Sequence, residues 1–132
     1  MIVDTSAVIE FLRGTGSSTH LALAQALRNE ASLWIPAVVL QEVLQGARDA
    51  SHFIRLQAQL DQLQVFEPED THELHRQAGL LFARCRWQGV MVRSPMDCVV
   101  AACALEADMP LLALDRDFSG ICRIEPKLKL IS

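Results

Sequence analysis

The first six residues, Met1 to Ser6, constrain the fold more than any other part of the chain. Two β-branched residues, Ile2 and Val3, run directly into Asp4 and two hydroxyl residues, and apolar residues then resume. This order predicts a short buried strand, a turn, and a helix that begins at once. Asp4 would then lie at the carboxyl end of a strand, where open parallel sheets place their ligand crevice. The alternative is that Asp4 or Thr5 only caps the helix by accepting bonds from its free N–H groups.

Short apolar segments alternate with helical patterns along the rest of the chain. The predicted strands are 33–35, 65–66, 111–114 and 121–124, and the predicted helices are 5–13, 18–30, 36–47, 51–63, 68–87 and 94–108. Residues 90–92 fit either a strand or a packed loop, and residues 128–131 form an apolar tail. Strands that alternate with helices predict an α/β fold with a short, mostly parallel central sheet and helices on both faces. A single domain over residues 1–132 is expected at this length.

The composition suits a folded domain and argues against a membrane span. Hydrophobic residues make up 51% of the chain and charged residues 21%, so it can bury enough apolar surface to fold. The longest apolar run, from Cys98 to Leu105, is eight residues and too short to cross a bilayer. Because the start lacks a secretory leader pattern, a cytoplasmic location is expected. Four cysteines without CxxC spacing are expected to be reduced, buried thiols rather than a zinc or redox site: Cys85, Cys98, Cys103 and Cys122.

The charge pattern limits the class of partner. The net charge of −4 argues against a general polyanion binder. Ten of the twelve basic residues are nevertheless arginine, which can bind a phosphate with two parallel hydrogen bonds. A local basic rim around an acidic centre therefore stays open, with solvated surface arginines as the alternative.

Glu42 is an acid within an apolar stretch. Val38 and Val39 precede it by one helical turn, so its face of the helix is largely apolar. The alternative is that Glu42 lies on one solvated stripe with Gln41 and Gln45.

Asp97 lies in the first turn of a predicted helix that is apolar all round and rich in small residues, which indicates that this helix is buried. Ser94 three residues earlier matches a capping box, with Pro95 at the first helical position. A capping role and a ligand role are compatible, because a carboxylate has two oxygens and several lone pairs.

Asp115 directly follows the predicted strand 111–114 and, like Asp4, would lie at the carboxyl end of a strand. Asp117 is expected to cap a short turn over residues 118–120. Turn chemistry is the alternative for both acids.

The predicted topology offers all four acids, Asp4, Glu42, Asp97 and Asp115, a route to the same edge of the sheet. Two charges about 5 Å apart repel by roughly 3 kcal/mol at an effective dielectric constant of about 20, and four acids make six pairs. Such a group must take up protons or bind a cation. Oxygen ligands without His or Cys suit Mg²⁺ or Mn²⁺, and such ions can activate water and stabilise the leaving oxygen of a phosphodiester. The hypothesis is metal-dependent hydrolysis of nucleic acid.

Four motifs occur in the order and spacing of PIN domains. They are MIVDTS at the start, Val43-Leu44 with Gly46 after Glu42, SPMDCVVAACAL, and LLALDRDF. Together they make the whole chain resemble the PIN-domain ribonucleases, above all the VapC-type toxins of type II toxin–antitoxin systems.

This resemblance implies a three-layer α/β/α fold and an endoribonuclease that depends on Mg²⁺ or Mn²⁺. It also implies a homodimer, a small cognate antitoxin that holds the enzyme inactive, and a particular tRNA or ribosomal RNA as substrate. The metal-binding and catalytic acids of the family map onto Asp4, Glu42, Asp97 and Asp115, and Thr5 or Ser6 matches the hydroxyl after the first acid.

One position departs from the family pattern. Ala113 stands where many relatives carry a threonine, which puts the fine geometry of the site in doubt but removes no ligand. Arg93 and Arg116 flank the acids and are candidate contacts to RNA phosphates, with solvated side chains as the alternative. Asp117 is a supporting candidate.

Other residues carry weaker signals. His72 and His75 are one turn apart on a predicted helix but have no further ligand nearby in sequence, so exposed histidines are expected. Trp34 and Trp87 are expected to pack in or against the core rather than to stack on RNA.

Two other functions are weighed against the nuclease. A receiver-type signalling domain would need a paired acid after its first strand and a lysine after a late strand, whereas this chain has Asp4 alone there and no lysine before Lys127. A catalytically degenerate PIN domain that only binds a partner would be expected to lack some of the four acids, all of which are present, while Ala113 leaves this alternative open.

Overall fold

Five short parallel strands form one sheet in the order β3-β2-β1-β4-β5. The computed structural model describes the backbone of residues 1–132 and every side chain except that of Asp115. The strands are β1 (Ile2–Val3), β2 (Trp34–Pro36), β3 (Gln64–Phe66), β4 (Leu111–Leu112) and β5 (Leu130–Ile131). The predicted α/β class with a short parallel sheet is confirmed.

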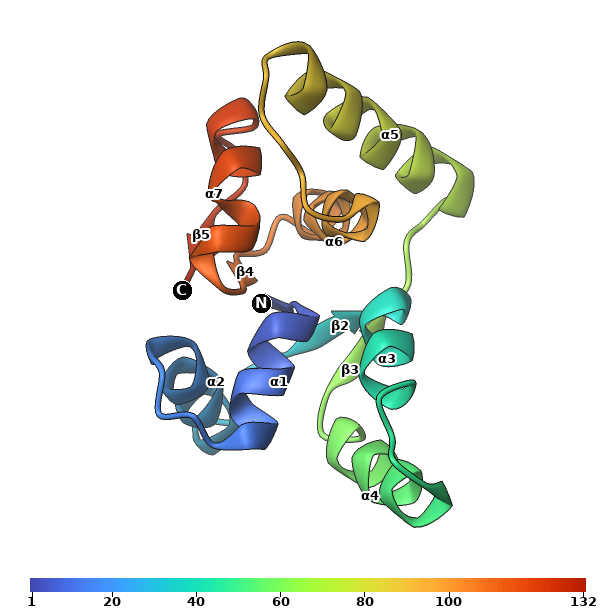
Figure 1. Cartoon of the computed structure of the whole chain (residues 1–132), viewed down its shortest axis with the longest axis vertical. Helices are drawn as coiled ribbons and strands as arrows, with labels where there is room; N and C mark the ends of the chain where they lie inside the picture. Colours follow the sequence, from blue (N-terminus) through green and yellow to red (C-terminus); the bar gives the residue numbers. More distant parts are fainter.

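Seven helices connect the strands and cover both faces of the sheet. They are α1 (Thr5–Arg13), α2 (Ser18–Arg28), α3 (Ala37–Leu44), α4 (Ala50–Leu60), α5 (Thr71–Trp87), α6 (Pro95–Ala107) and α7 (Asp115–Ile124). Figure 1 shows α5, α6 and α7 on one side of the strands and α1, α2 and α4 on the other. This is the layered arrangement that alternating strands and helices require.

The strand order places a topological switch beside β1. The chain moves from β1 through β2 to β3 in one direction, and then returns to build β4 and β5 on the other side of β1. Ile2 pairs with Trp34 of β2 and with Leu111 of β4. In open parallel sheets the carboxyl ends of the strands at such a switch border a ligand crevice. The residues that follow β1 and β4 are therefore those that the fold brings to this crevice.

The core is aliphatic and closes around the central strands. Ile2, Val3, Leu111 and Leu112 are fully buried, as expected for strands covered on both faces. Helix α6 is the most deeply buried helix, with six consecutive or near-consecutive core positions: Cys98, Val100, Ala101, Ala102, Cys103 and Ala104. Burial raises the pKa of the Cys98 and Cys103 thiols to about 12, so these two cysteines are protonated packing residues at neutral pH. Among the described residues, no helix combines the length and the apolar character needed to cross a membrane.

The C-terminal quarter differs from the sequence prediction. Residues 121–124 were predicted as a strand, but they belong to α7, which begins at Asp115. The last strand is instead β5, inside the predicted tail. Strand β4 ends at Leu112, two residues earlier than predicted. Two element boundaries also differ from the prediction. Pro36 is the last residue of β2, whereas it was predicted to open a helix, and α5 begins at Thr71 rather than at residue 68.

Residues 118–120 were predicted to form a short turn, yet all three, including Gly120, lie inside α7. A Cβ at this position would come within 2.7 Å of the Val90 Cγ1 atom. Gly120 therefore marks a close approach between α7 and the loop 88–94, and does not break the helix. Residues 90–92, left undecided by the sequence, are part of this loop.

We predict opposite stability effects for two helical glycines. Gly79 in α5 has nothing near its Cβ position, so Gly79→Ala should stabilise the protein by about 1 kcal/mol through helix propensity. Gly120→Ala should destabilise it by about 1 kcal/mol or more, because the new methyl group overlaps Val90. Thermal unfolding monitored by circular dichroism measures both. The double variant Gly120→Ala/Val90→Ala should recover much of the loss, and a stabilised Gly120→Ala single variant would contradict the packing described.

Candidate active site at the switch point

The site begins at Asp4, directly after β1. Asp4 is only 5% exposed, and its extended backbone makes it the N-cap of α1. The Ser6 amide and the Ser6 hydroxyl both donate to Asp4 Oδ2, at 3.0 and 2.6 Å. The capping residue is thus Asp4 itself and not Thr5 or Ser6. Capping fixes the position of the carboxylate, because two hydrogen bonds leave it little rotational freedom.

Ser6 also connects the ends of the two central strands. Its hydroxyl donates to Asp4 and accepts a hydrogen bond from the Leu114 amide at 3.1 Å. Leu114 is the residue just before α7, so one hydroxyl joins the turn after β1 to the turn after β4. Ala113, one residue before Leu114, is fully buried. Ser6 is therefore a positioning residue for the acidic site.

Glu42 of α3 lies beside Asp4. Burial raises the pKa of the Glu42 carboxyl, and the charge of Asp4 raises it further, while the Thr5 hydroxyl opposes this shift. The Thr5 Oγ1 atom is buried and has no hydrogen-bond partner of ordinary geometry, although it faces Glu42. A buried hydroxyl without a partner is uncommon and costs free energy. Of the two readings of Glu42, the structure supports a half-buried acid next to Asp4 rather than a solvated one.

Asp97 joins the group from the first turn of α6. Burial is the largest cause that raises the pKa of Asp97 to about 7, followed by repulsion from Asp4, Asp117 and Glu42. Ser94 caps the helix by accepting from the Met96 amide at 3.2 Å. The cap is therefore made by Ser94, and the Asp97 carboxylate lies among other acids. Asp4 has a raised pKa as well, caused first by burial and only partly offset by the hydrogen bonds from Ser6.

Asp117 belongs to the same acidic group, although the sequence placed it in a turn. Its charge raises the pKa of both Asp4 and Asp97. It also forms an ion pair with Arg93 at 2.9 Å, and the Arg116 Nε atom lies 3.8 Å away. Arg93 and Arg116 are both largely exposed at the rim of the site. The supporting role of Asp117 stays a prediction, and the residue lies in α7 and not before a turn.

Asp115 is the first residue of α7, and its side chain lies outside the described residues. Among the side chains that are described, no three acids, histidines or cysteines are arranged to hold one ion. Asp4, Glu42, Asp97 and Asp117 are close enough to repel one another without forming a closed ligand shell. The structure therefore brings three of the four predicted ligands into one electrostatic group and leaves the fourth a prediction.

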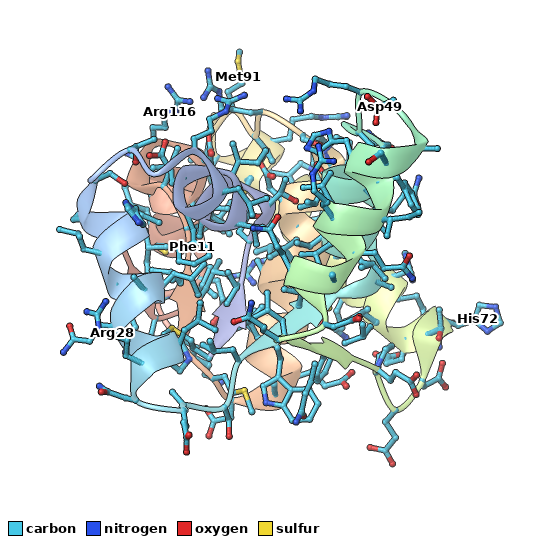
Figure 2. The ribbon with its side chains drawn as sticks, turned by 90° about the horizontal axis from the view of Figure 1, so that it is seen from below. Phe11, Arg28, Asp49, His72, Met91 and Arg116 are labelled. Carbon is cyan, nitrogen blue, oxygen red and sulfur yellow. The ribbon has the colours of Figure 1, made fainter. Side chains whose placement is uncertain are left out.

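The structure also places the histidines and tryptophans that carried weaker signals in the sequence. His72 and His75 are exposed on α5, and Figure 2 shows His72 pointing away from the molecule. Trp34 is partly buried, as predicted. Trp87 was expected to pack but is 70% exposed at the end of α5, so that prediction was wrong. Helical periodicity alone could not show that α5 ends with one face uncovered.

A model of the PIN domain family matches residues 1–124. The chain therefore belongs to the PIN domain family, as its motifs predicted.

Within that family it groups with the VapC ribonucleases. Its curated relatives include Ribonuclease VapC11 of Mycobacterium tuberculosis and a VapC ribonuclease of Mycobacterium bovis. Each is 30% identical over 125 residues, which is 94% of this chain and 92% of the relative.

Solved structures show the same fold over the whole chain. VapBC-1 from nontypeable Haemophilus influenzae matches with a TM-score of 0.75 at 18% identity, covering 99% of this chain and 96% of that one. VapBC2 from Rickettsia felis, bound to a DNA fragment from its promoter, matches with a TM-score of 0.74 at 18% identity, covering 98% and 96%. FitAcB from Neisseria gonorrhoeae matches with a TM-score of 0.70 at 14% identity, covering 99% and 96%.

The raised pKa of Asp97 predicts a pH-dependent stability. From about pH 4 to about pH 7 the unfolded chain has lost the Asp97 proton while the folded protein still holds it. Because the folded state binds more protons in this range, stability should fall as pH rises and level off above about pH 7. In EDTA, the melting temperature of the wild type should fall by several degrees between about pH 5 and pH 8.

The fall of the melting temperature with rising pH should be much smaller for Asp97→Asn, because the asparagine side chain cannot ionise. Asp61→Asn is a matched control, because Asp61 is an exposed acid at the end of α4. A slope in Asp97→Asn as steep as in the wild type would show that other groups carry the pH dependence.

Proposed function

We propose that this protein is a metal-dependent endoribonuclease that hydrolyses RNA phosphodiester bonds and acts as the toxin of a toxin–antitoxin pair. The observation that carries the proposal is the mutual repulsion of Asp4, Glu42 and Asp97 at the topological switch point. Acids gathered at a ligand crevice without matching cations are costly unless a cation binds there. The ribonuclease names of its 30%-identical relatives support the same reading.

The residues present fit a hard divalent cation. Carboxylates and hydroxyls are the available donors, and all of them are oxygen ligands of the kind that Mg²⁺ and Mn²⁺ prefer. The Thr5 hydroxyl is an orphaned buried oxygen next to Glu42, which a water or ion in the site would satisfy. Asp4, Glu42, Asp97 and Asp115 are the proposed ligands, and Asp117 is a supporting acid.

The chain's own residues have distinct tasks in this proposal. Asp4 is held in place by Ser6, so it contributes a carboxylate whose position is set before any ligand arrives. Asp97, with a pKa of about 7, can release its proton near neutral pH and become an anionic donor. A bound Mg²⁺ or Mn²⁺ would supply an activated water and charge stabilisation at the leaving oxygen.

RNA would approach across the rim formed by exposed arginines. Arg93 and Arg116 lie beside Asp117, and their side chains are 59% and 72% exposed. We propose that both contact phosphates of a structured RNA, of the tRNA or ribosomal RNA class. Because tRNA and ribosomal RNA are found in the cytoplasm, we propose a cytoplasmic location for the protein.

We further propose two protein partners. The solved structures named VapBC support a small cognate antitoxin for this chain too. A homodimer is supported by large apolar side chains that stay exposed on α5 and in the loop after it. Leu80 is 46% exposed, Trp87 70% and Met91 92%, and large exposed apolar groups mark contact surfaces.

The purified protein, freed of antitoxin, should cleave structured RNA in Mg²⁺ or Mn²⁺ but not in EDTA. Asp4→Asn and Asp97→Asn should each lower the rate by more than about a hundredfold, because even partners outside the ligand shell change metal sites by roughly 10- to 100-fold. Denaturing gels of a labelled tRNA mixture measure the rate, with Asp61→Asn as the control variant.

Melting temperatures provide an independent check. Divalent ions should raise that of the wild type but not that of Asp4→Asn, because bound ligand stabilises only a folded site that can hold it. Equal cleavage in EDTA, or the same thermal shift in both proteins, would remove the metal from the mechanism. A wild type that binds RNA without cleaving it would favour the degenerate binding module instead.

The dimer proposal can be tested by light scattering. The double variant Trp87→Ser/Met91→Ser should be monomeric at concentrations where the wild type is dimeric, because it removes two exposed apolar anchors. Ile54→Ser is a matched control, since Ile54 is a 66% exposed apolar residue on α4. A dimer that survives the double variant would place the interface elsewhere.

A further inference from the structure

A second pocket borders the acidic site on the side of α4. It has a volume of about 350 Å³ and runs from Glu42 along the C-terminal part of α1. Its floor is apolar, and four side chains from three helices form it: Ile9, Leu12, Val43 and Leu56. A pocket of this size and character suits a small organic group. Because Glu42 lines both this pocket and the acidic site, whatever fills the pocket lies next to the reacting centre.

The rim of the pocket carries cationic and N–H donor groups. Arg13 comes from the end of α1, Arg48 from the loop before α4, and His52 from the first turn of α4. The Arg48 amide donates to His52 Nδ1 at 3.0 Å. The neutral His52 ring therefore carries its proton on Nε2, which can donate to a ligand. No residue of this rim was singled out by the sequence.

The two arginines are available for an anion. Among the described side chains, no carboxylate lies within ion-pair distance of Arg13 or Arg48. The nearest acids make their hydrogen bonds with other groups: Glu10 accepts from the Thr15 hydroxyl, and Asp49 accepts from the His52 amide at 2.7 Å as the cap of α4. The charges of Arg13 and Arg48 act on these two acids without forming an ion pair, so both guanidinium groups keep their donors for a ligand.

We propose that this pocket is a nucleotide subsite that holds one residue of the RNA adjacent to the bond that is cut. The inference rests on the proposed ribonuclease function and names where its substrate is held. The base would lie against the apolar floor, and its phosphate would contact Arg13 and Arg48. A nucleotide combines an anionic phosphate with a flat base whose faces can pack on apolar groups. A cationic rim over an apolar floor is complementary to this combination.

The position of the pocket fits a substrate that reaches the acids. Figure 2 shows Asp49, Met91 and Arg116 along the upper edge of the molecule, with Arg28 lower down on the left. Arg48 precedes Asp49 in the chain, and the charges of Arg13 and Arg116 both act on Glu10. An RNA strand held in the pocket would therefore lie next to Glu42 of the acidic site and near Arg116. The acids do not bind the phosphates themselves, so flanking cations must supply that attraction.

The test is binding of a fluorescein-labelled single-stranded RNA, followed by polarisation in EDTA at several salt concentrations. Arg13→Gln and Arg48→Gln should each weaken binding about tenfold, the loss of one charge-assisted hydrogen bond. Each should also reduce the magnitude of the slope of log K against log salt by about 0.7, the value for one phosphate contact on a single strand. Arg48→Lys should keep most of that slope because it keeps the charge.

Arg28→Gln is the matched control, since Arg28 is an exposed arginine at the end of α2 and away from the pocket. Equal weakening by Arg28→Gln would show non-specific attraction and overturn the subsite. Unchanged RNA binding in the Arg13 and Arg48 variants would also overturn the subsite. If these variants keep RNA binding but lose affinity for an acidic protein segment, the pocket binds protein and the subsite is likewise overturned.

Cleavage kinetics separate this proposal from the proposed function. With Mn²⁺, Arg13→Gln and Arg48→Gln should raise KM and leave kcat within about twofold, because the pocket binds ground state and transition state alike. If both variants cleave RNA with metal and with an unchanged KM, the ribonuclease function stands and the subsite is contradicted. If the wild type cuts no RNA but binds it, and Arg48→Gln weakens that binding, the subsite stands and the hydrolysis is contradicted.

Discussion

Repulsion between carboxylates at the carboxyl ends of β1 and β4 is the constraint on which the rest of this molecule depends. Asp4, Glu42, Asp97 and Asp117 come from four different segments; burial is the largest cause that raises the pKa values of the first three, and repulsion within the group raises them further. Such a group opposes folding at neutral pH, since it brings like charges into a half-buried place. The fold must therefore be held together by other interactions that are strong enough to keep the acids near one another.

Those interactions are the buried strands, the apolar helix α6, and one hydroxyl. The strands are only two or three residues long, but the central ones are fully buried and pair on both sides. Helix α6 packs small residues against the sheet, which lets its first turn bring Asp97 close to Asp4. Ser6 joins the turn after β1 to the turn after β4. Apolar burial thus supplies the free energy, and a local hydrogen bond supplies the geometry.

An acidic site that acts on an anionic polymer needs cations of two kinds. A divalent ion would balance the carboxylates at the centre, and arginines would attract the phosphates on either side. Arg93 and Arg116 lie beside Asp117, and Arg13 and Arg48 border the apolar pocket. In the proposed function, a chain with a net charge of −4 holds RNA through this local attraction and not through its overall charge.

The sequence by itself determined the parallel α/β class, the strand that ends at Asp4, and the set of acids, because these depend on local periodicity and on the types of residues at the strand ends. Its motifs were also sufficient to indicate the PIN domain family. Only the tertiary structure decided that residues 115–124 are a helix. Gly120 looked like a turn signal, and its real cause is the contact with Val90, thirty residues away in sequence. The exposure of Trp87, the ion pair of Arg93 with Asp117 and the pocket between α1 and α4 were likewise settled by which elements pack together. Contacts between distant segments leave no periodic trace in the sequence, so the acids could be named from it, while their surroundings could not.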